Sequence, residues 1–276
     1  MILGGRFDWM AEKIVVRGGG DIATGVVQKF HRAGFNVLIL EIPEPTAIRR
    51  SVALSEAAYD GVATVEDILC RNVMDVDQLG GCWKAREVPL LLDPLGDAIC
   101  EVKPSAVIDA ILAKRNMGTN KEMAKITIAL GPGFCAGKDV HVVIETMRGH
   151  DLGRLILRGN AKPDTGTPGE IDGKSAERVL RSPIAGTVTA VKQIGEVVQQ
   201  GEIIFSVGGQ AVYATFTGLV RGMIRDGMEV VQGMKIADID PRTDIDVGTI
   251  SDKARCIGGA ALEAYFYQRN QFGVDQ

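Results

Sequence analysis

A run of glycines directly after a β-branched segment constrains this chain more than any other feature. Lys13–Arg17 has the composition of a buried strand, and Gly18, Gly19 and Gly20 follow it, with Asp21 opening an amphipathic segment. Glycine accepts positive φ and lets other groups approach the main chain, while the first N–H groups of a helix have no partner within it. The sequence therefore predicts a strand, a tight turn and a helix, with an anion-binding site at the turn.

The spacing of these residues fits a dinucleotide-binding fingerprint. Gly18 and Gly20 are followed by Ala23 at the third small position, and a second apolar run ends at Glu41. In such a fingerprint the pyrophosphate lies on the turn and an acid at the end of the second strand binds a ribose hydroxyl. We therefore expect ligand phosphates on the N–H groups of Gly18, Gly19 and Gly20, and Glu41 on a ribose.

Asp21 favours a different interpretation of the same turn. Its carboxylate follows the third glycine, where it is expected to cap the helix and to repel a pyrophosphate. The helix itself is well specified, because Ile22, Val26 and Phe30 form one apolar row and Gly34 stands where a helix ends. A ligand-free turn with its own aspartate cap is the structural alternative to a nucleotide site.

Composition excludes several classes of protein. The 276 residues carry 31 basic and 35 acidic side chains, well mixed, so no basic face for nucleic acid is expected. The longest apolar runs are too short to span a bilayer and the first dozen residues lack a signal-peptide pattern, which predicts a cytoplasmic protein without membrane contact. Five widely spaced cysteines and three histidines indicate neither a disulfide framework nor a metal site, and homo-oligomerisation is left open.

The length and the pattern predict two domains of different class. Residues 13–160 alternate strands and helices and are predicted to form a Rossmann-like α/β domain, residues 161–180 a linker, and residues 181–243 a small all-β domain. A helix over 251–270, with Ser251 as N-cap, is expected to return to the first domain. Its Gly258 and Gly259 predict close packing or a nearby ligand. Further strands of the first domain are expected at 88–92, 106–111, 126–130 and 140–145.

The all-β segment contains an internal repeat with an offset of 32 residues, which matches Gly186, Gly195 and Gly201 to Gly218, Gly227 and Gly233. Neither half is long enough to cover its own apolar face, so two interlocking halves are expected.

This repeat resembles a biotinyl or lipoyl domain, which is a barrel-sandwich hybrid. Such domains attach their cofactor to a lysine at the hairpin between the halves, whereas this chain has Gly208, Gly209 and Gln210 there. Covalent biotin or lipoyl is therefore not expected, and a packing, dimerisation or clamping module is favoured.

A second glycine-rich loop follows the strand at 126–130. Gly131, Gly133 and Cys135 could line the same cleft as the first glycines, although Asp139 and the spacing exclude a Walker A motif. Cys135 is expected near Lys138, which favours a thiolate and a nucleophilic or sulfur-handling role. The alternative is a bystander cysteine.

Charged residues elsewhere add candidates for the same cleft. Arg49 and Arg50 follow the second strand and are expected to face the first glycine turn with their guanidinium groups. Residues 145–154 are dense in polar groups and could bind an anionic substrate. Surface charge and a solvated turn are the respective alternatives.

Together, residues 16–25, residues 31–35, Glu41, residues 131–134 and residues 145–154 carry a family resemblance. The chain resembles the YqeB-type accessory proteins of selenium-dependent molybdenum hydroxylase systems from about Lys13 to the last helix. The resemblance implies a role in maturing such an enzyme by handling its molybdopterin or labile selenium, with the hydroxylase apoprotein or its maturation machinery as partner. It supplies no catalytic residue.

Three functional hypotheses remain, and the sequence does not decide whether the protein is an enzyme. The first is an accessory protein that binds a nucleotide or a molybdopterin dinucleotide at Gly18–Gly20. The second is an NAD(P)-dependent oxidoreductase with Glu41 on the ribose. The third is a ligand-free interaction module.

Overall fold

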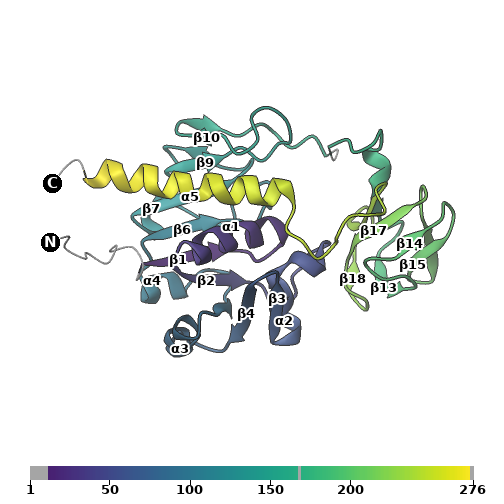
Figure 1. The fold of residues 1–276 in the computed structure, drawn as a ribbon, viewed down its shortest axis with the longest axis horizontal. Helices are drawn as coiled ribbons and strands as arrows, with labels where there is room; N and C mark the ends of the chain where they lie inside the picture. The colour runs from purple at the N-terminus through teal and green to yellow at the C-terminus, as the bar shows by residue number, and fades with distance from the viewer. Residues whose placement is uncertain (1–11, 167–168, 274–276) are drawn as a thin grey trace. The chain divides into compact units, whose positions relative to one another are not determined.

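The computed structural model describes residues 12–166 and 169–273 and forms two compact units (Figure 1). Among these residues, the first unit comprises 12–45, 53–164 and 250–273. The second comprises 46–52, 165–166 and 169–249. The chain therefore passes through the second unit twice, once as the short segment 46–52 and once as a long insertion before the last helix.

The first unit contains a nine-stranded, mostly parallel sheet in the order β10-β9-β7-β6-β1-β2-β5-β4-β3. Neighbours from β4 to β9 pair in parallel, and the edge strands β3 and β10 are antiparallel. Its strands are β1 (Lys13–Arg17), β2 (Asn36–Glu41), β3 (Val62–Val65), β4 (Ile68–Val73), β5 (Val88–Leu92), β6 (Ala106–Asp109), β7 (Ile126–Leu130), β9 (Val142–Ile144) and β10 (Leu155–Ile156), while β8 (Cys135–Ala136) pairs separately with β11 (Gly159–Asn160).

The predicted opening of the chain is confirmed, with one difference further on. Strand β1, helix α1 (Asp21–Arg32) and strand β2 lie where the apolar pattern places them, and Gly34 adopts φ +97° just after the helix. Strand β6 ends at Asp109 instead of residue 111, because the Asp109 carboxylate accepts a hydrogen bond from the N–H of Ile111 and turns the chain.

Two sets of helices cover opposite faces of this sheet. Helices α3 (Leu79–Lys84) and α4 (Ala98–Val102) pack their apolar side chains with alternate residues of β1, β2 and β6. The other face carries α1 and α5 (Asp252–Gly273), which lie side by side in Figure 1. There Phe30, Phe35 and Tyr265 stack edge to face, with ring centroids 5.0–5.8 Å apart. Helix α2 (Ala57–Asp60) is short and lies near β3 and β4.

Helix α5 approaches α1 closely where Gly258 of α5 meets Gly25 of α1. This contact accounts for Gly258 but not for its neighbour Gly259. A Cβ atom on Gly258 would lie 2.3 Å from the carbonyl oxygen of Gly25, and one on Gly25 would lie 2.4 Å from the carbonyl oxygen of Ala254. A Cβ atom on Gly259 would meet nothing within 4 Å. At the start of α5, the Ser251 hydroxyl accepts a hydrogen bond from the N–H of Ala254, as expected of an N-cap.

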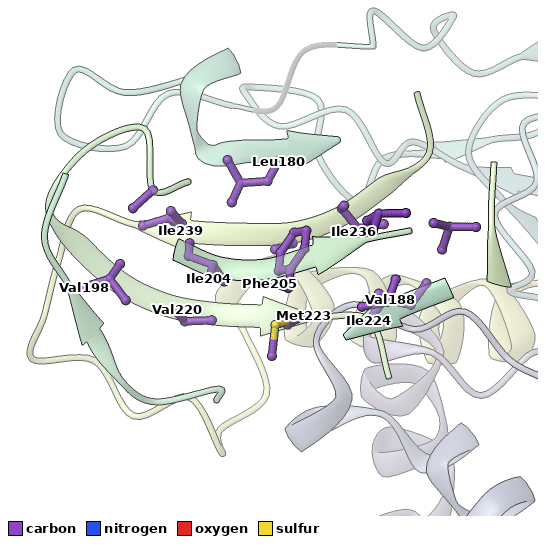
Figure 2. Close-up of a cluster of buried hydrophobic side chains, with 14 of the residues drawn as sticks. Leu180, Val188, Val198, Ile204, Phe205, Val220, Met223, Ile224, Ile236 and Ile239 are labelled. Atoms are coloured by element: carbon purple, nitrogen blue, oxygen red, sulfur yellow. The ribbon is translucent and has the colours of Figure 1, made fainter. Parts of the chain in front are cut away.

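The second unit is built from two four-stranded antiparallel sheets, ordered β12-β19-β17-β14 and β16-β15-β13-β18. Its strands are β12 (Val179–Arg181), β13 (Gly186–Ala190), β14 (Val197–Val198), β15 (Ile203–Val207), β16 (Gln210–Tyr213), β17 (Gly218–Met223), β18 (Glu229–Val230) and β19 (Lys235–Asp240). Figure 2 shows their apolar side chains, among them Val188, Phe205 and Ile236, gathered in one core.

The two halves of the repeat interlock, as the sequence predicts. Strands β13 and β14 of the first half pair with β18 and β17 of the second. The N–H of Gly195 donates to the carbonyl of Val220, and the N–H of Gly227 donates to the carbonyl of Val188, both at 2.9 Å. These two hydrogen bonds are related by the 32-residue offset, so each half completes the turn of the other.

Within residues 12–166 and 169–273, no helix has both the length and the apolar composition that a membrane span requires.

The glycines of α5 provide a matched pair for a stability test. We expect Gly258→Ala to lower the free energy of unfolding by about 1–3 kcal/mol, because the methyl group would push α5 away from α1. We expect Gly259→Ala to raise it by up to about 1 kcal/mol, because alanine favours the helix and the space is open. Urea unfolding of both variants measures the difference, and equal effects would contradict the close packing.

Candidate functional site

The glycine turn after β1 uses most of its polar main-chain groups within the protein. The N–H of Gly18 donates to the carbonyl of Leu40 at 2.8 Å, and the N–H of Gly19 donates to Glu41 Oε2 at 2.7 Å. The carbonyl of Gly19 accepts a hydrogen bond from the N–H of Ser55. The expectation that ligand phosphates lie on the amides of Gly18 and Gly19 is therefore wrong, because both already have acceptors.

The three glycines of the turn have different surroundings. Gly18 has φ +93°, and a Cβ atom there would lie 3.1 Å from the carbonyl oxygen of Ala110. A Cβ atom on Gly19 would lie 3.0 Å from the nitrogen of Ser55. Around Gly20, by contrast, a Cβ atom would meet nothing within 4 Å. The first two glycines are thus required by the fold, whereas the third borders open space.

The start of α1 differs from the predicted aspartate cap. Gly20 is the N-cap residue, with extended φ and ψ and no side-chain cap, and Asp21 is the first residue of the helix. The Asp21 carboxylate instead attracts the ammonium group of Lys253. Burial lowers the pKa of Lys253, and the charge of Asp21 partly opposes that shift. The first turn of α1 therefore has one acidic and one basic side chain beside it.

Glu41 lies beside the glycine turn, at the carboxyl end of β2. Its Oε1 accepts a hydrogen bond from the N–H of Ile42 and its Oε2 the one from Gly19. Burial raises the pKa of Glu41, and these two hydrogen bonds partly oppose the shift. Each carboxylate oxygen can accept more than one hydrogen bond, so the group retains capacity for a further donor.

The second glycine-rich loop is closed by contacts within the protein. A Cβ atom on Gly131 would lie 2.5 Å from Thr146 Oγ1, and one on Gly133 would lie 2.7 Å from the main chain of Arg115. The N–H of Cys135 donates to Asp139 Oδ2 at 2.8 Å. Cys135 is half-buried, and its Sγ is 3.8 Å from the carbonyl of Ala136. Protein contacts therefore account for both glycines.

Arg49 belongs to the second unit and not to the unit that contains the glycine turn. Its Nη2 donates to the carbonyl of Thr249 at 3.3 Å, and the Nε of Arg50 donates to the carbonyl of Met223 at 2.8 Å. Both guanidinium groups thus hold the segment 46–52 within the second unit. Within the first unit, Gly18–Gly20, Asp21 and Glu41 come together, and Arg49 is not among them.

The polar run after β9 proves to be an ordered turn. The buried Glu145 accepts hydrogen bonds from the N–H groups of Met147 and Lys162, at 2.8 and 2.9 Å. Arg148 pairs with Asp252, and Lys162 pairs with Asp151. In the part of the chain that the structure describes, no cluster of three or more His, Cys, Asp or Glu side chains is arranged to hold a metal ion.

Sequence reasoning missed a buried polar group at the carboxyl ends of β1 and β6. Arg17 and Asp109 are register partners on these two strands, and each is only 2% exposed. Arg17 Nη1 donates to Thr119 Oγ1, whose hydroxyl donates to Asp109 Oδ2, both at 2.6 Å. Burial raises the pKa of Asp109. The available signal was a charged residue at the end of each apolar strand, immediately before the chain turns.

Comparison with known proteins gives a close relative. The chain is a homologue of the "uncharacterized protein YqeB" of Escherichia coli K12, with 46% identity over 259 residues. The match covers 94% of this chain and 48% of that protein, so the chain spans about half the length of the relative. No family model matches the chain.

Solved structures give only distant similarity. An aspartoacylase family protein from Mesorhizobium loti has 10% identity and a TM-score of 0.26, over 83% of this chain and 84% of its own. The ectoine utilization protein EutE from Ruegeria pomeroyi has 11% identity and a TM-score of 0.25, over 83% and 85%. Scores this low carry no conclusion about this chain.

The contrast between Gly18 and Gly20 is open to a stability test. We expect Gly18→Ala to lower the free energy of unfolding by about 1–3 kcal/mol, because alanine disfavours positive φ and would crowd Ala110. Gly20→Ser should be neutral or stabilising by up to about 1 kcal/mol, because serine is a better N-cap and the space is open. Chemical denaturation of both variants checks this, and a strongly destabilised Gly20→Ser would contradict it.

Proposed function

We propose that this homologue of YqeB binds a nucleotide or a molybdopterin dinucleotide at the carboxyl ends of β1 and β2, in a Rossmann-like sheet. The parallel strands β5-β2-β1-β6-β7-β9 follow the strand order of a dinucleotide-binding sheet. The chain leaves β1 toward one edge of the sheet and later returns to β6 to build the other. Ligands of open α/β sheets bind outside the carboxyl ends of the strands at such a reversal point.

The observation that carries the proposal is the position of Glu41. Its carboxylate ends β2 directly beside the turn between β1 and α1, within hydrogen-bonding distance of Gly19. A carboxylate at this place binds ribose hydroxyls in dinucleotide-binding sheets. Glu41 is mostly buried, so hydroxyl donors from a ligand would offset its desolvation.

The turn offers fewer free N–H groups for the anionic part of the ligand than the sequence predicts. Because Gly18 and Gly19 donate within the protein, the start of α1 at Gly20 is the part of this turn that remains for a phosphate. The helix dipole favours an anion there, and the positive charge of Lys253 interacts with Asp21 beside it. Gly131, Gly133 and Cys135 follow β7, which is separated from β1 by β6, and would border the same edge of the sheet.

We propose the maturation of a selenium-dependent molybdenum hydroxylase as the cellular role. The resemblance to YqeB-type accessory proteins supports this role. In this role the second unit, as a barrel-sandwich module, would hold the partner proteins in position. It would carry no covalently attached cofactor, since its turn at Gly208 and Gly209 has no lysine. Molybdenum and selenium contents of the hydroxylase, purified from cells with and without this chain, test the role. Equal contents in both would contradict it.

The same position of Glu41 also supports an NAD(P)-dependent oxidoreductase as the second candidate. Purified protein that contains NAD and changes absorbance at the nicotinamide band when a substrate is added would favour that candidate. Co-purified pterin or nucleotide, detected by native mass spectrometry, without turnover favours the accessory role. A preparation that binds neither favours a ligand-free interaction module.

The role of Glu41 predicts a preference for ribose. We expect ADP to bind about tenfold more tightly than 2′-deoxy-ADP, because a carboxylate accepts a strong hydrogen bond from the 2′-hydroxyl. Glu41→Gln should abolish this ratio. Isothermal titration calorimetry measures both affinities, and equal binding of the two nucleotides by the unmodified chain would contradict a ribose contact.

The ribose preference should also depend on pH. The pKa of Glu41 is raised above its ordinary value of 4.5, so the carboxylate takes up its proton at a higher pH than an exposed glutamate does. The preference for ADP should therefore be complete at neutral pH and decline as the pH falls toward that raised pKa. The Glu41→Gln variant should give no such decline, and a decline that persists in it would assign the pH dependence to another group.

Gly20→Ser separates a ligand-binding turn from a structural one. The serine hydroxyl would accept a hydrogen bond from the first turn of α1 and would occupy the open space. We therefore expect a stable protein whose affinity for ADP is at least about tenfold lower. Unchanged affinity in the folded variant would remove the phosphate from the helix terminus.

A further inference from the structure

Arg17 is a buried cation whose hydrogen-bonding capacity is only partly used. It ends β1, and the structure gives acceptors to two of its five N–H groups, on Thr119 at 2.6 Å and on the carbonyl of Pro94 at 3.1 Å. Among the described residues, no carboxylate forms an ion pair with its guanidinium. Buried charges in proteins are normally paired, so this arrangement leaves room for an anion.

Arg17 and Asp109 interact through Thr119 and also through space, since the charge of Arg17 partly opposes the burial that raises the pKa of Asp109. The hydroxyl of Thr119 accepts from Arg17 and donates to Asp109, whose other oxygen accepts the N–H of Ile111. This relay fixes the orientation of the guanidinium, since Thr119 and Pro94 hold two of its nitrogens. Both carboxylate oxygens of Asp109 are thus engaged without contacting Arg17 directly.

A glycine, with no side chain of its own, lies against the guanidinium of Arg17. This residue is Gly96, and a Cβ atom there would be 3.6 Å from Arg17 Nε and 3.8 Å from Cζ. Among the described residues, the Nε of Arg17 has no acceptor. Because Arg17 is only 2% exposed, a phosphate would have to approach the guanidinium past the main chain of Gly96.

Exposed apolar side chains follow three of the strands at this edge of the sheet. Leu92 and Leu95 follow the end of β5 and are 39% and 75% exposed, and Ile111 follows β6 with 37% exposed. Ile42, next to Glu41, is 42% exposed. Ligand pockets combine apolar walls with a few placed polar groups, and a heterocyclic base would lie well on such residues.

We infer that Arg17 is the receptor for a phosphate group of the ligand, held in place by Thr119 and Asp109. The inference rests on the proposed nucleotide site and adds to it the residue that binds the charge. A guanidinium matches the geometry of phosphate oxygens and stays charged at all physiological pH values. It supplies the donors that the amides of Gly18 and Gly19 do not. Thr119 and Asp109 are positioning residues in this scheme.

Calorimetric titrations of the full chain with ADP, adenosine and inorganic pyrophosphate test the inference. We expect Arg17→Met to bind ADP at least about tenfold more weakly, with adenosine unchanged, because only the phosphate contact is lost. Thr119→Val should weaken ADP binding about threefold or more, because the guanidinium loses a tether. Arg158→Met is the matched control and should bind ADP normally, since Arg158 is exposed and follows β10, which runs away from this edge.

The outcomes separate a binding role from a structural one. A folded Arg17→Met variant, checked by circular dichroism, that binds ADP as tightly as the unmodified chain would overturn the inference. If Arg17→Met does not fold, unchanged ADP affinity in folded Thr119→Val overturns it instead. If the unmodified chain binds neither ADP nor adenosine, the nucleotide proposal fails. Pyrophosphate then decides whether Arg17 is a phosphate receptor. Pyrophosphate binding that is lost in folded Arg17→Met, or weakened in folded Thr119→Val, supports the receptor. If the unmodified chain does not bind pyrophosphate, or the folded variants bind it equally well, the inference is overturned.

Discussion

The hydrogen bond from the Gly19 amide to the Glu41 carboxylate joins the two strands on which the first unit depends. Strands β1 and β2 are the centre of the sheet, and α1 connects them. The bond closes the turn that starts α1 and fixes the end of β2 at the same point. A buried N–H without an acceptor would cost about 1–3 kcal/mol, so the carboxylate is part of the fold whether or not a ligand binds.

This double role explains which parts of the site were predictable from sequence. The strand, the turn, the helix and the acid at the end of β2 follow from local pattern, and all four are found in place. The partners of the glycine amides do not follow from it, because Glu41 is 22 residues from Gly19 along the chain. The contacts of Arg49 could not be read from local pattern for the same reason, because its short segment belongs to the second unit through contacts with residues far along the chain.

The repeat in the second unit was predictable for a different reason. An offset of constant length makes every contact of one half imply a second contact in the other. The reciprocal bonds of Gly195 and Gly227 follow this rule, and so does the exchange of strands between the halves. Nothing comparable exists for α5, where Gly258 and Gly259 are neighbours with opposite surroundings. Only tertiary structure distinguishes the glycine that packs from the one that does not.

The buried charged side chains at the carboxyl ends of the strands differ in how many of their hydrogen-bonding groups have partners within the protein. Glu145 and Asp109 are almost fully buried, and the oxygens of each are engaged by protein donors, which is sufficient reason for their presence. Arg17 is equally buried but uses two of five N–H groups. Buried charges seldom add net stability, but removal of Arg17 alone would leave the buried Asp109 without the cation that interacts with it. Within the fold, Arg17 offsets the buried charge of Asp109, and its remaining N–H groups are those that the proposed phosphate would bind.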